Sequence, residues 1–252
     1  MKNILKNKKV SNIVGPLIAL IVLSLFLTII TDQFFKTNNL LNILRQASIN
    51  ALVSFGMLFV LLTGGIDLSV GATIACSGCM MGIMIKAGIN NTFLLLLVGL
   101  LCGVLIGLVN GLLFTKLDLP HPFVSTLGTQ LVIRGFCLWI TGSASMSGFS
   151  EGVMFLGYES IGGFPVCFIL VIIVAVVASI FLNKTAFGRY IYSIGGNREA
   201  ARLSGIKVKP LLNLTYILSG LLAALAGIVM IGRVSLACLL YTSDAADDLT
   251  RV

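Results

Sequence analysis

The sequence predicts an all-α integral membrane protein that crosses the bilayer about seven times. Of its 252 residues, 58% are hydrophobic and 10% are charged, whereas a soluble domain carries about 25% charged residues. Apolar runs recur along the chain, separated by polar segments. The net charge of +8 is typical of basic cytoplasmic loops, and no basic patch interleaved with aromatic residues indicates nucleic-acid binding.

The first predicted span covers residues 13–30. This apolar run is long for the core of a signal peptide, and no small-x-small cleavage site follows it, so we interpret it as a transmembrane helix. A cluster of lysines before it places the N-terminus in the cytoplasm: Lys2, Lys6, Lys8 and Lys9.

The second predicted span, residues 48–62, is short for crossing about 30 Å of hydrocarbon. Gly64 and Gly65 follow it and allow the backbone to leave the helical conformation. We therefore expect this helix to stop within or near the membrane. The third predicted span covers residues 69–85.

The segment between these spans reads LLTGGIDLSVGAT, and its Asp67 has no cation beside it in the sequence. A carboxylate at bilayer depth indicates a functional site. Two interpretations are open. The segment is either a broken helix that lines a cavity, with Ser69 and Gly71 in the same motif, or a polar turn at the membrane surface.

The fourth predicted span, residues 92–114, carries a stripe of glycines at every fourth position: Gly99, Gly103, Gly107 and Gly111. Such a stripe predicts close packing against another helix. Asn110 lies beside it, either as an interhelical hydrogen-bonding group or as a residue of a transport pathway.

The fifth predicted span, residues 123–140, contains Arg134. An arginine at this depth must pair, reach the interface or face water, and Asp67 is a candidate partner. Residues 141–165 form a glycine- and serine-rich loop without lysine or arginine, which we expect outside the cell.

The sixth and seventh predicted spans, residues 166–182 and 211–231, enclose a basic segment at 183–210. Its excess of lysine and arginine predicts a cytoplasmic loop, in agreement with the count of spans. Asn197 is expected to cap a short helix from Arg198 to Ser204 that ends at Gly205.

The chain shows no catalytic or metal-binding constellation. It has no G-x-x-x-x-G-K-[ST] motif to bind nucleotide phosphates. His121 is its one histidine, so a three-histidine zinc site is excluded. Cys76 and Cys79 form a C-x-x-C inside an apolar run, without a second pair beside them. We expect neither an enzyme nor a resident cofactor.

Three stretches resemble one family. TGGIDLSVG resembles the signature of permease subunits of bacterial ABC importers for ribose and related monosaccharides, and PFVSTLGT is similar to the same family. GRYIYSIGGNREAARLSGI resembles the family's coupling loop, with an EAA-x-x-x-G core that docks on the ATPase. That core corresponds to Glu199, Ala200, Ala201 and Gly205, preceded by Arg198. The resemblance covers about residues 40–236.

The resemblance implies a multi-pass subunit of the bacterial cytoplasmic membrane that imports a ribose-like sugar. It implies three partners: a cytoplasmic subunit that binds ATP, an extracytoplasmic sugar-binding protein, and a second permease subunit, expected as a homodimer. An alternative is a stand-alone secondary transporter that uses a broken helix around Asp67. The docking motif argues against this alternative.

The last residues differ in character from the rest. Residues 238–252, CLLYTSDAADDLTRV, resemble translated read-through of a sequencing adapter. We therefore expect a non-native tail after a truncated transmembrane permease domain, residues 1–237, in which residues 183–210 form the coupling loop. An ordinary polar C-terminal tail is the alternative.

Overall fold

The computed structural model describes residues 8–117 and 119–237, so the expectation for the tail lies outside the described residues. The chain divides into two units, Met1–Leu44 and Arg45–Val252. Helix α1 (Lys8–Ile30) belongs to the first unit, and α2 (Thr37–Leu61) runs from the first into the second. The second unit holds the remaining helices: α3 (Val70–Lys86), α4 (Thr92–Lys116), α5 (Phe123–Thr141), α6 (Glu151–Tyr158), α7 (Val166–Lys184), α8 (Ala186–Gly196), α9 (Arg198–Leu203) and α10 (Val208–Val234).

The all-α membrane fold is confirmed. Five described helices are long and apolar enough to cross a membrane, and two shorter apolar helices cover Val14–Ile30 and Val70–Lys86. These seven correspond in order to the seven predicted spans. The prediction of a short second span is wrong, because α2 begins at Thr37 and has 25 residues. The short helix is α3, with 17 residues.

Helix α10 forms the centre of the second unit, and α4 packs along it. The glycine stripe of α4 makes this approach possible. A Cβ atom at Gly103 would overlap the carbonyl oxygen of Gly220, and one at Gly107 would overlap the carbonyl oxygen of Tyr216. The packing interpretation of the stripe is therefore confirmed.

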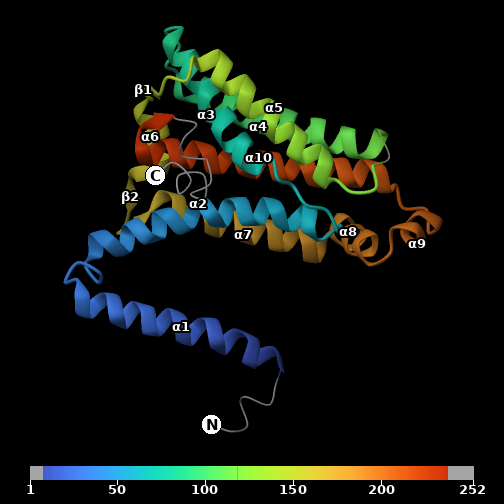
Figure 1. The fold of residues 1–252 in the computed structure, drawn as a ribbon, viewed down its shortest axis with the longest axis horizontal. Helices are drawn as coiled ribbons and strands as arrows, with labels where there is room; N and C mark the ends of the chain where they lie inside the picture. The colour runs from blue at the N-terminus through green and yellow to red at the C-terminus, as the bar shows by residue number, and fades with distance from the viewer. Residues whose placement is uncertain (1–7, 118, 238–252) are drawn as a thin grey trace, which may run out of the picture. The chain divides into compact units, whose positions relative to one another are not determined.

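The polar connections lie at the two ends of the second unit. Figure 1 shows α8 and α9 at one end, and α6 with the short strands at the other. There β1 (Met146–Ser147) pairs antiparallel with β4 (Leu236–Ala237), and β2 (Ser160–Ile161) pairs with β3 (Phe164–Pro165). The segment expected as a plain external loop thus contains a helix and three strands.

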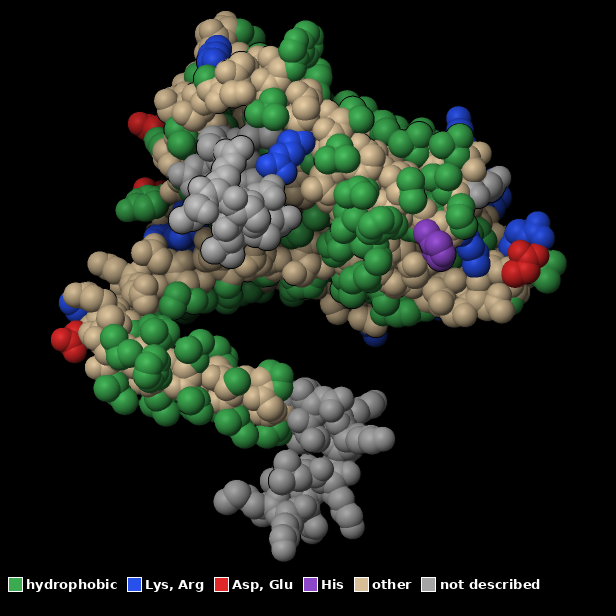
Figure 2. Space-filling view, in the orientation of Figure 1, with side chains coloured by type: hydrophobic (Ala, Val, Ile, Leu, Met, Phe, Trp, Pro, Cys, Tyr) green, Lys and Arg blue, Asp and Glu red, His purple; other side chains and the backbone are tan. Residues whose placement is uncertain are grey.

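Hydrophobic side chains cover the outer face of α5. Figure 2 shows them over the part of the second unit where α5 lies. The most exposed are Val124, Val132 and Trp139, at 67%, 71% and 79%. An apolar outer surface of this kind is typical of contact with lipid.

Candidate coupling loop and buried polar junction

The surroundings favour glycine at both glycine positions of the TGGID segment. Helix α2 ends at Leu61, and residues 62–69 are not helical. Gly64 has a φ of +75°, which favours glycine. A Cβ atom at Gly65 would lie 2.8 Å from the phenolic oxygen of Tyr216 on α10. The expected break from helical backbone is confirmed.

Asp67 is buried just before α3, with 1% of its surface exposed. Its Oδ1 accepts hydrogen bonds from the backbone nitrogen and the hydroxyl of Ser69, at 3.0 and 2.7 Å, and its Oδ2 accepts one from the Ser219 hydroxyl at 2.8 Å. The N-terminus of α3 adds a favourable dipole for a negative charge. The carboxylate is thus held by three donors inside the protein.

A second polar side chain completes this arrangement. The Asn110 side-chain nitrogen on α4 donates to the Ser69 hydroxyl at 2.7 Å. We call Asp67, Ser69, Asn110 and Ser219 the polar junction, since they join the start of α3 to α4 and α10. Asn110 Oδ1 and the hydroxyl of Tyr216 are buried and have no hydrogen-bond partner among the described residues.

Arg134 is not the partner of Asp67. It lies half-buried on α5, and among the described residues it forms no ion pair with a carboxylate. The oxygens of Asp67 accept hydrogen bonds from Ser69 and Ser219 instead. The pairing expected from the sequence is therefore wrong.

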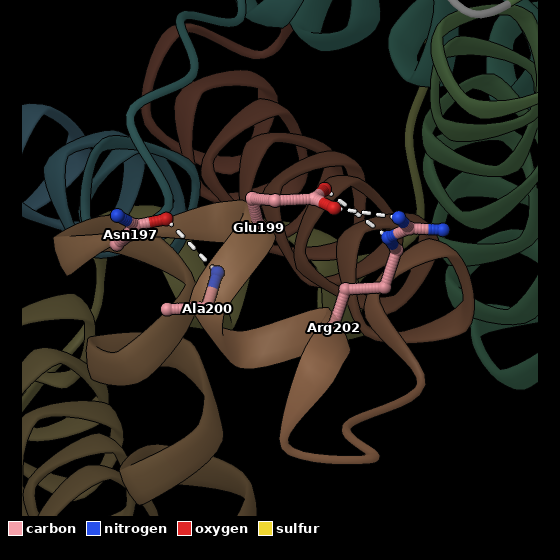
Figure 3. A network of polar contacts seen from close by, with 4 residues as sticks. All are labelled: Asn197, Glu199, Ala200 and Arg202. Carbon is pink, nitrogen blue, oxygen red and sulfur yellow. Dashed lines mark hydrogen bonds and ion pairs between the residues drawn. The ribbon is translucent and has the colours of Figure 1, made fainter.

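The short helix α9 has a cap at each end. The Asn197 side chain accepts a hydrogen bond from the backbone nitrogen of Ala200 at 3.0 Å, as Figure 3 shows. At the other end Gly205 has a φ of +83°, and its nitrogen donates to the Arg202 carbonyl while the nitrogen of Ile206 donates to that of Ala201. This pair of bonds is a Schellman motif. Both caps expected from the sequence are confirmed.

One face of α9 packs inward and another is open. Ala201 is buried, whereas Leu203 is 77% exposed. Glu199 and Arg202 are exposed and form a two-pronged ion pair, with the shorter contact at 2.5 Å (Figure 3). The hydrogen bonds from Arg202 lower the pKa of Glu199 from its ordinary value, so both groups are charged at neutral pH.

Side-chain contacts connect α9 with the TGGID segment. The Arg198 guanidinium lies 4.9 Å from the centre of the Phe114 ring, within cation–π range. That ring packs edge-on against Tyr216 at 6.0 Å, and Tyr216 in turn faces Gly65. Just before α9, a Cβ atom at Gly195 would overlap the carbonyl oxygen of Leu62. The α8–α9 loop is therefore connected to the non-helical segment after α2 in two ways, through the Arg198–Phe114–Tyr216 contacts and through the contact of Gly195 with Leu62.

The remaining predicted residues occupy different surroundings. Gly71 lies in the first turn of α3, and a Cβ atom added there would meet nothing within 4 Å. Cys76, Cys79 and Cys137 are free thiols that pack with alanine and isoleucine in an apolar cluster. Ser219 is the one member of the polar junction that the sequence did not indicate, because 152 residues separate it from Asp67.

Known proteins match most of this chain. Residues 39–239 match the family model described as "Branched-chain amino acid transport system / permease component". The ribose import permease protein of Bacillus subtilis is 41% identical over 221 residues, which cover 87% of this chain and 68% of that protein. The ribose import permease protein of Escherichia coli K12 is 40% identical over 223 residues, 87% of this chain and 69% of that protein.

A third relative is named for a different sugar. The galactose/methyl galactoside import permease protein of Escherichia coli K12 is 32% identical over 238 residues, 87% of this chain and 70% of that protein. No solved structure matches the chain. The resemblance found in the sequence is thereby confirmed, and the chain belongs to the family of multi-pass membrane permeases of ABC importers that includes the ribose import permeases.

Proposed function

We propose that this chain is the membrane-spanning subunit that carries a monosaccharide, with ribose as the first candidate, across the bacterial cytoplasmic membrane. The relatives support this substrate class, since their names include ribose, allose, galactose and fructose. Ribose is favoured because identity is 41% to a ribose permease and 34% to a fructose permease. In this proposal the N-terminus and the α8–α9 loop lie in the cytoplasm.

The observation that carries the proposal is the capped and exposed helix α9. A six-residue helix is too short to persist by propensity alone, yet this one has an Asn197 cap and a Gly205 cap that fix its ends. Its Glu199, Arg202 and Leu203 side chains are exposed. We infer that this surface, with Ala200 at its start, is the docking site for a separate ATP-binding subunit.

The contacts behind α9 support a mechanical role. A displacement of α9 would act on Phe114 through Arg198 and on Leu62 through Gly195. Both contacts lead to the segment that holds Gly64, Gly65 and Asp67. ATP-driven movement of the partner would thereby shift this segment and open or close the sugar pathway. The sugar-binding protein would deliver its ligand at the opposite end, and a second copy of the permease would complete the assembly.

The family description weighs against a stand-alone carrier, since it names a component of a transport system. Asp67 accepts three hydrogen bonds, and in this proposal its carboxylate positions the segment before α3.

Uptake into proteoliposomes tests the proposal. The permease is reconstituted with an ATP-binding subunit and a sugar-binding protein of the proposed importer, and radiolabelled ribose is offered with allose, galactose or fructose as competitors. We expect uptake that requires ATP and the binding protein. Uptake that persists without ATP would refute the importer function, and stronger competition by another sugar would replace ribose as the substrate.

A further inference from the structure

The side chain of Tyr216 lies where the contacts of α9 meet the non-helical segment after α2. It belongs to α10 and is fully buried, with 0% of its surface exposed. Its ring packs edge-on against the Phe114 ring, over which the Arg198 guanidinium of α9 lies. Its hydroxyl lies so close to Gly65 that a Cβ atom there would be 2.8 Å from the phenolic oxygen. One side chain therefore connects the contacts of α9 with the TGGID segment.

The packing around Tyr216 leaves its ring little room to move independently. The ring belongs to a buried cluster that includes Val60 of α2, Phe114 of α4 and Ala201 of α9. On the backbone side, a Cβ atom at Gly107 of α4 would overlap the Tyr216 carbonyl oxygen. Close-packed interiors transmit displacements, because they contain few voids that could absorb them. A shift of α9 is therefore passed on to the Tyr216 ring.

The Tyr216 hydroxyl is unusual for a buried group. It has no hydrogen-bond partner among the described residues, although a buried tyrosine hydroxyl usually has one. Asp67 and Arg198 are near enough to interact with it electrostatically. A buried hydroxyl without a partner costs free energy in folding, so phenylalanine would serve packing alone better than tyrosine. The oxygen therefore indicates a role beyond the packing of this cluster.

We infer that Tyr216 is a positioning residue of the transport cycle, whose hydroxyl passes the displacement of α9 to the TGGID segment through its contact with Gly65. The inference rests on the function proposed above, in which an ATP-binding subunit moves α9. A displaced Phe114 would tilt the Tyr216 ring, and the ring would press its oxygen against the Gly65 backbone. Because Gly65 lies two residues before Asp67, the movement reaches the segment that the polar junction anchors to α4 and α10.

The first test removes only the oxygen. Tyr216→Phe keeps the ring contact with Phe114 and loses the contact with Gly65, and Tyr190→Phe on the exposed side of α8 is the matched control. In the reconstituted importer we expect Tyr216→Phe to lower ATP-driven ribose uptake and sugar-stimulated ATPase activity about fivefold or more. Tyr190→Phe should change both by less than about twofold.

The melting temperature separates a positioning role from a structural one. It should not fall in Tyr216→Phe, because the substitution removes no hydrogen bond to a described residue. Normal uptake by Tyr216→Phe would overturn the inference. A loss of uptake that accompanies a lower melting temperature would overturn it as well.

The second test refills the space that the oxygen leaves. Gly65 has no positive φ, so its backbone accepts alanine, but the methyl group of Gly65→Ala would crowd the Tyr216 hydroxyl. Gly71→Ala is the control, because nothing lies within 4 Å of the added carbon. We expect Gly65→Ala to lower uptake and Gly71→Ala to leave it within about twofold of wild type.

The double variant Gly65→Ala/Tyr216→Phe places the new methyl group where the oxygen was. If the contact passes the movement, the two changes should compensate each other, and uptake should rise above that of both single variants. Uptake no higher than that of the single variants would show that the two positions act independently and would overturn the inference.

The inference and the proposed function fail in different ways. ATP-driven uptake by wild type, together with no compensation in the double variant, would overturn the role of Tyr216 and leave the importer function intact. Absence of ATP-driven uptake by the unmodified complex would refute the importer function itself.

Discussion

Two carboxylates of this protein have similar hydrogen bonding and opposite surroundings. Asp67 is 1% exposed and accepts three hydrogen bonds from neutral serine groups. Glu199 lies on the exposed face of α9 and accepts two from the Arg202 guanidinium. Among the described residues, no cation forms an ion pair with Asp67, whereas Arg202 forms one with Glu199. A simple electrostatic expectation would place the cation beside the buried carboxylate instead.

Burial therefore decides which of these two sets of hydrogen bonds stabilises the fold. A buried donor that loses its acceptor keeps its desolvation cost, whereas an exposed donor turns to water. The polar junction therefore holds α3, α4 and α10 in place. The Glu199–Arg202 pair shapes a surface that a partner can recognise, and it contributes little to folding.

Removal of the Asp67 carboxylate should have the largest effect on stability. Asp67→Ala leaves the Ser69 nitrogen and two serine hydroxyls without an acceptor, and we expect a loss of about 3 kcal/mol in the free energy of unfolding. Asp67→Asn keeps one acceptor oxygen and should cost about 1 kcal/mol. Unfolding in mixed detergent micelles measures both. Equal stability of wild type and Asp67→Ala would contradict a structural role for the junction, and normal transport by Asp67→Asn would show that its charge is incidental.

The next largest effect on stability is expected at Ser219, which follows Asp67 by 152 residues in the chain. Ser219→Ala removes one buried donor to Asp67, so we expect a loss of about 1–2 kcal/mol in the free energy of unfolding. Ser204→Ala is the matched control, because the Ser204 hydroxyl donates to the Ala200 carbonyl on the exposed helix α9. Its effect should be within about 0.5 kcal/mol. Similar losses for the two variants would remove the distinction between the regions.

A smaller and local effect is expected at the C-terminal cap of α9. Gly205 has a φ of +83°, and an alanine in this conformation costs about 1 kcal/mol. Gly205→Ala should loosen α9 without affecting the unfolding of the whole protein. Faster amide hydrogen exchange confined to residues 198–206 is the expected result, and unchanged exchange there would show that the cap does not hold the helix.

The smallest effect on folding is expected at the exposed ion pair. Because Arg202 lowers the pKa of Glu199, the small stabilisation that this exposed pair contributes is present above the ordinary pKa of a glutamate and is lost as the pH falls through the lowered value. Melting temperatures of wild type and Glu199→Gln should coincide at neutral pH within error. A clear difference would show that the pair contributes to folding and would weaken the comparison with Asp67.

The sequence predicts regular and local features of this molecule well. Long apolar runs locate α4, α5, α7 and α10 to within a few residues, because about 20 apolar residues are needed to cross a bilayer. The caps of α9 are also local: Asn197 and Gly205 act on backbone groups a few residues away.

Features that depend on distant residues or on mixed composition are not predictable in this way. The first turns of α2 carry Asn38, Asn39 and Asn42, which lower the hydropathy there and hide the start of the helix. The contact of Asp67 with Ser219 joins residues that are 152 positions apart, and it forms only when the segment before α3 packs against α10. Arg134 suggested the wrong partner because it is an arginine inside a predicted span, and composition alone does not show which way α5 directs its side chain.

The most direct test of the account is the ATPase activity of the reconstituted importer with Gly205→Pro in the permease. Proline cannot adopt the positive φ of Gly205 and has no backbone nitrogen to donate to the Arg202 carbonyl. We predict normal membrane insertion together with loss of the ATPase stimulation that the sugar-loaded binding protein causes in wild type. Unchanged stimulation would contradict the claim that α9 couples ATP use to transport.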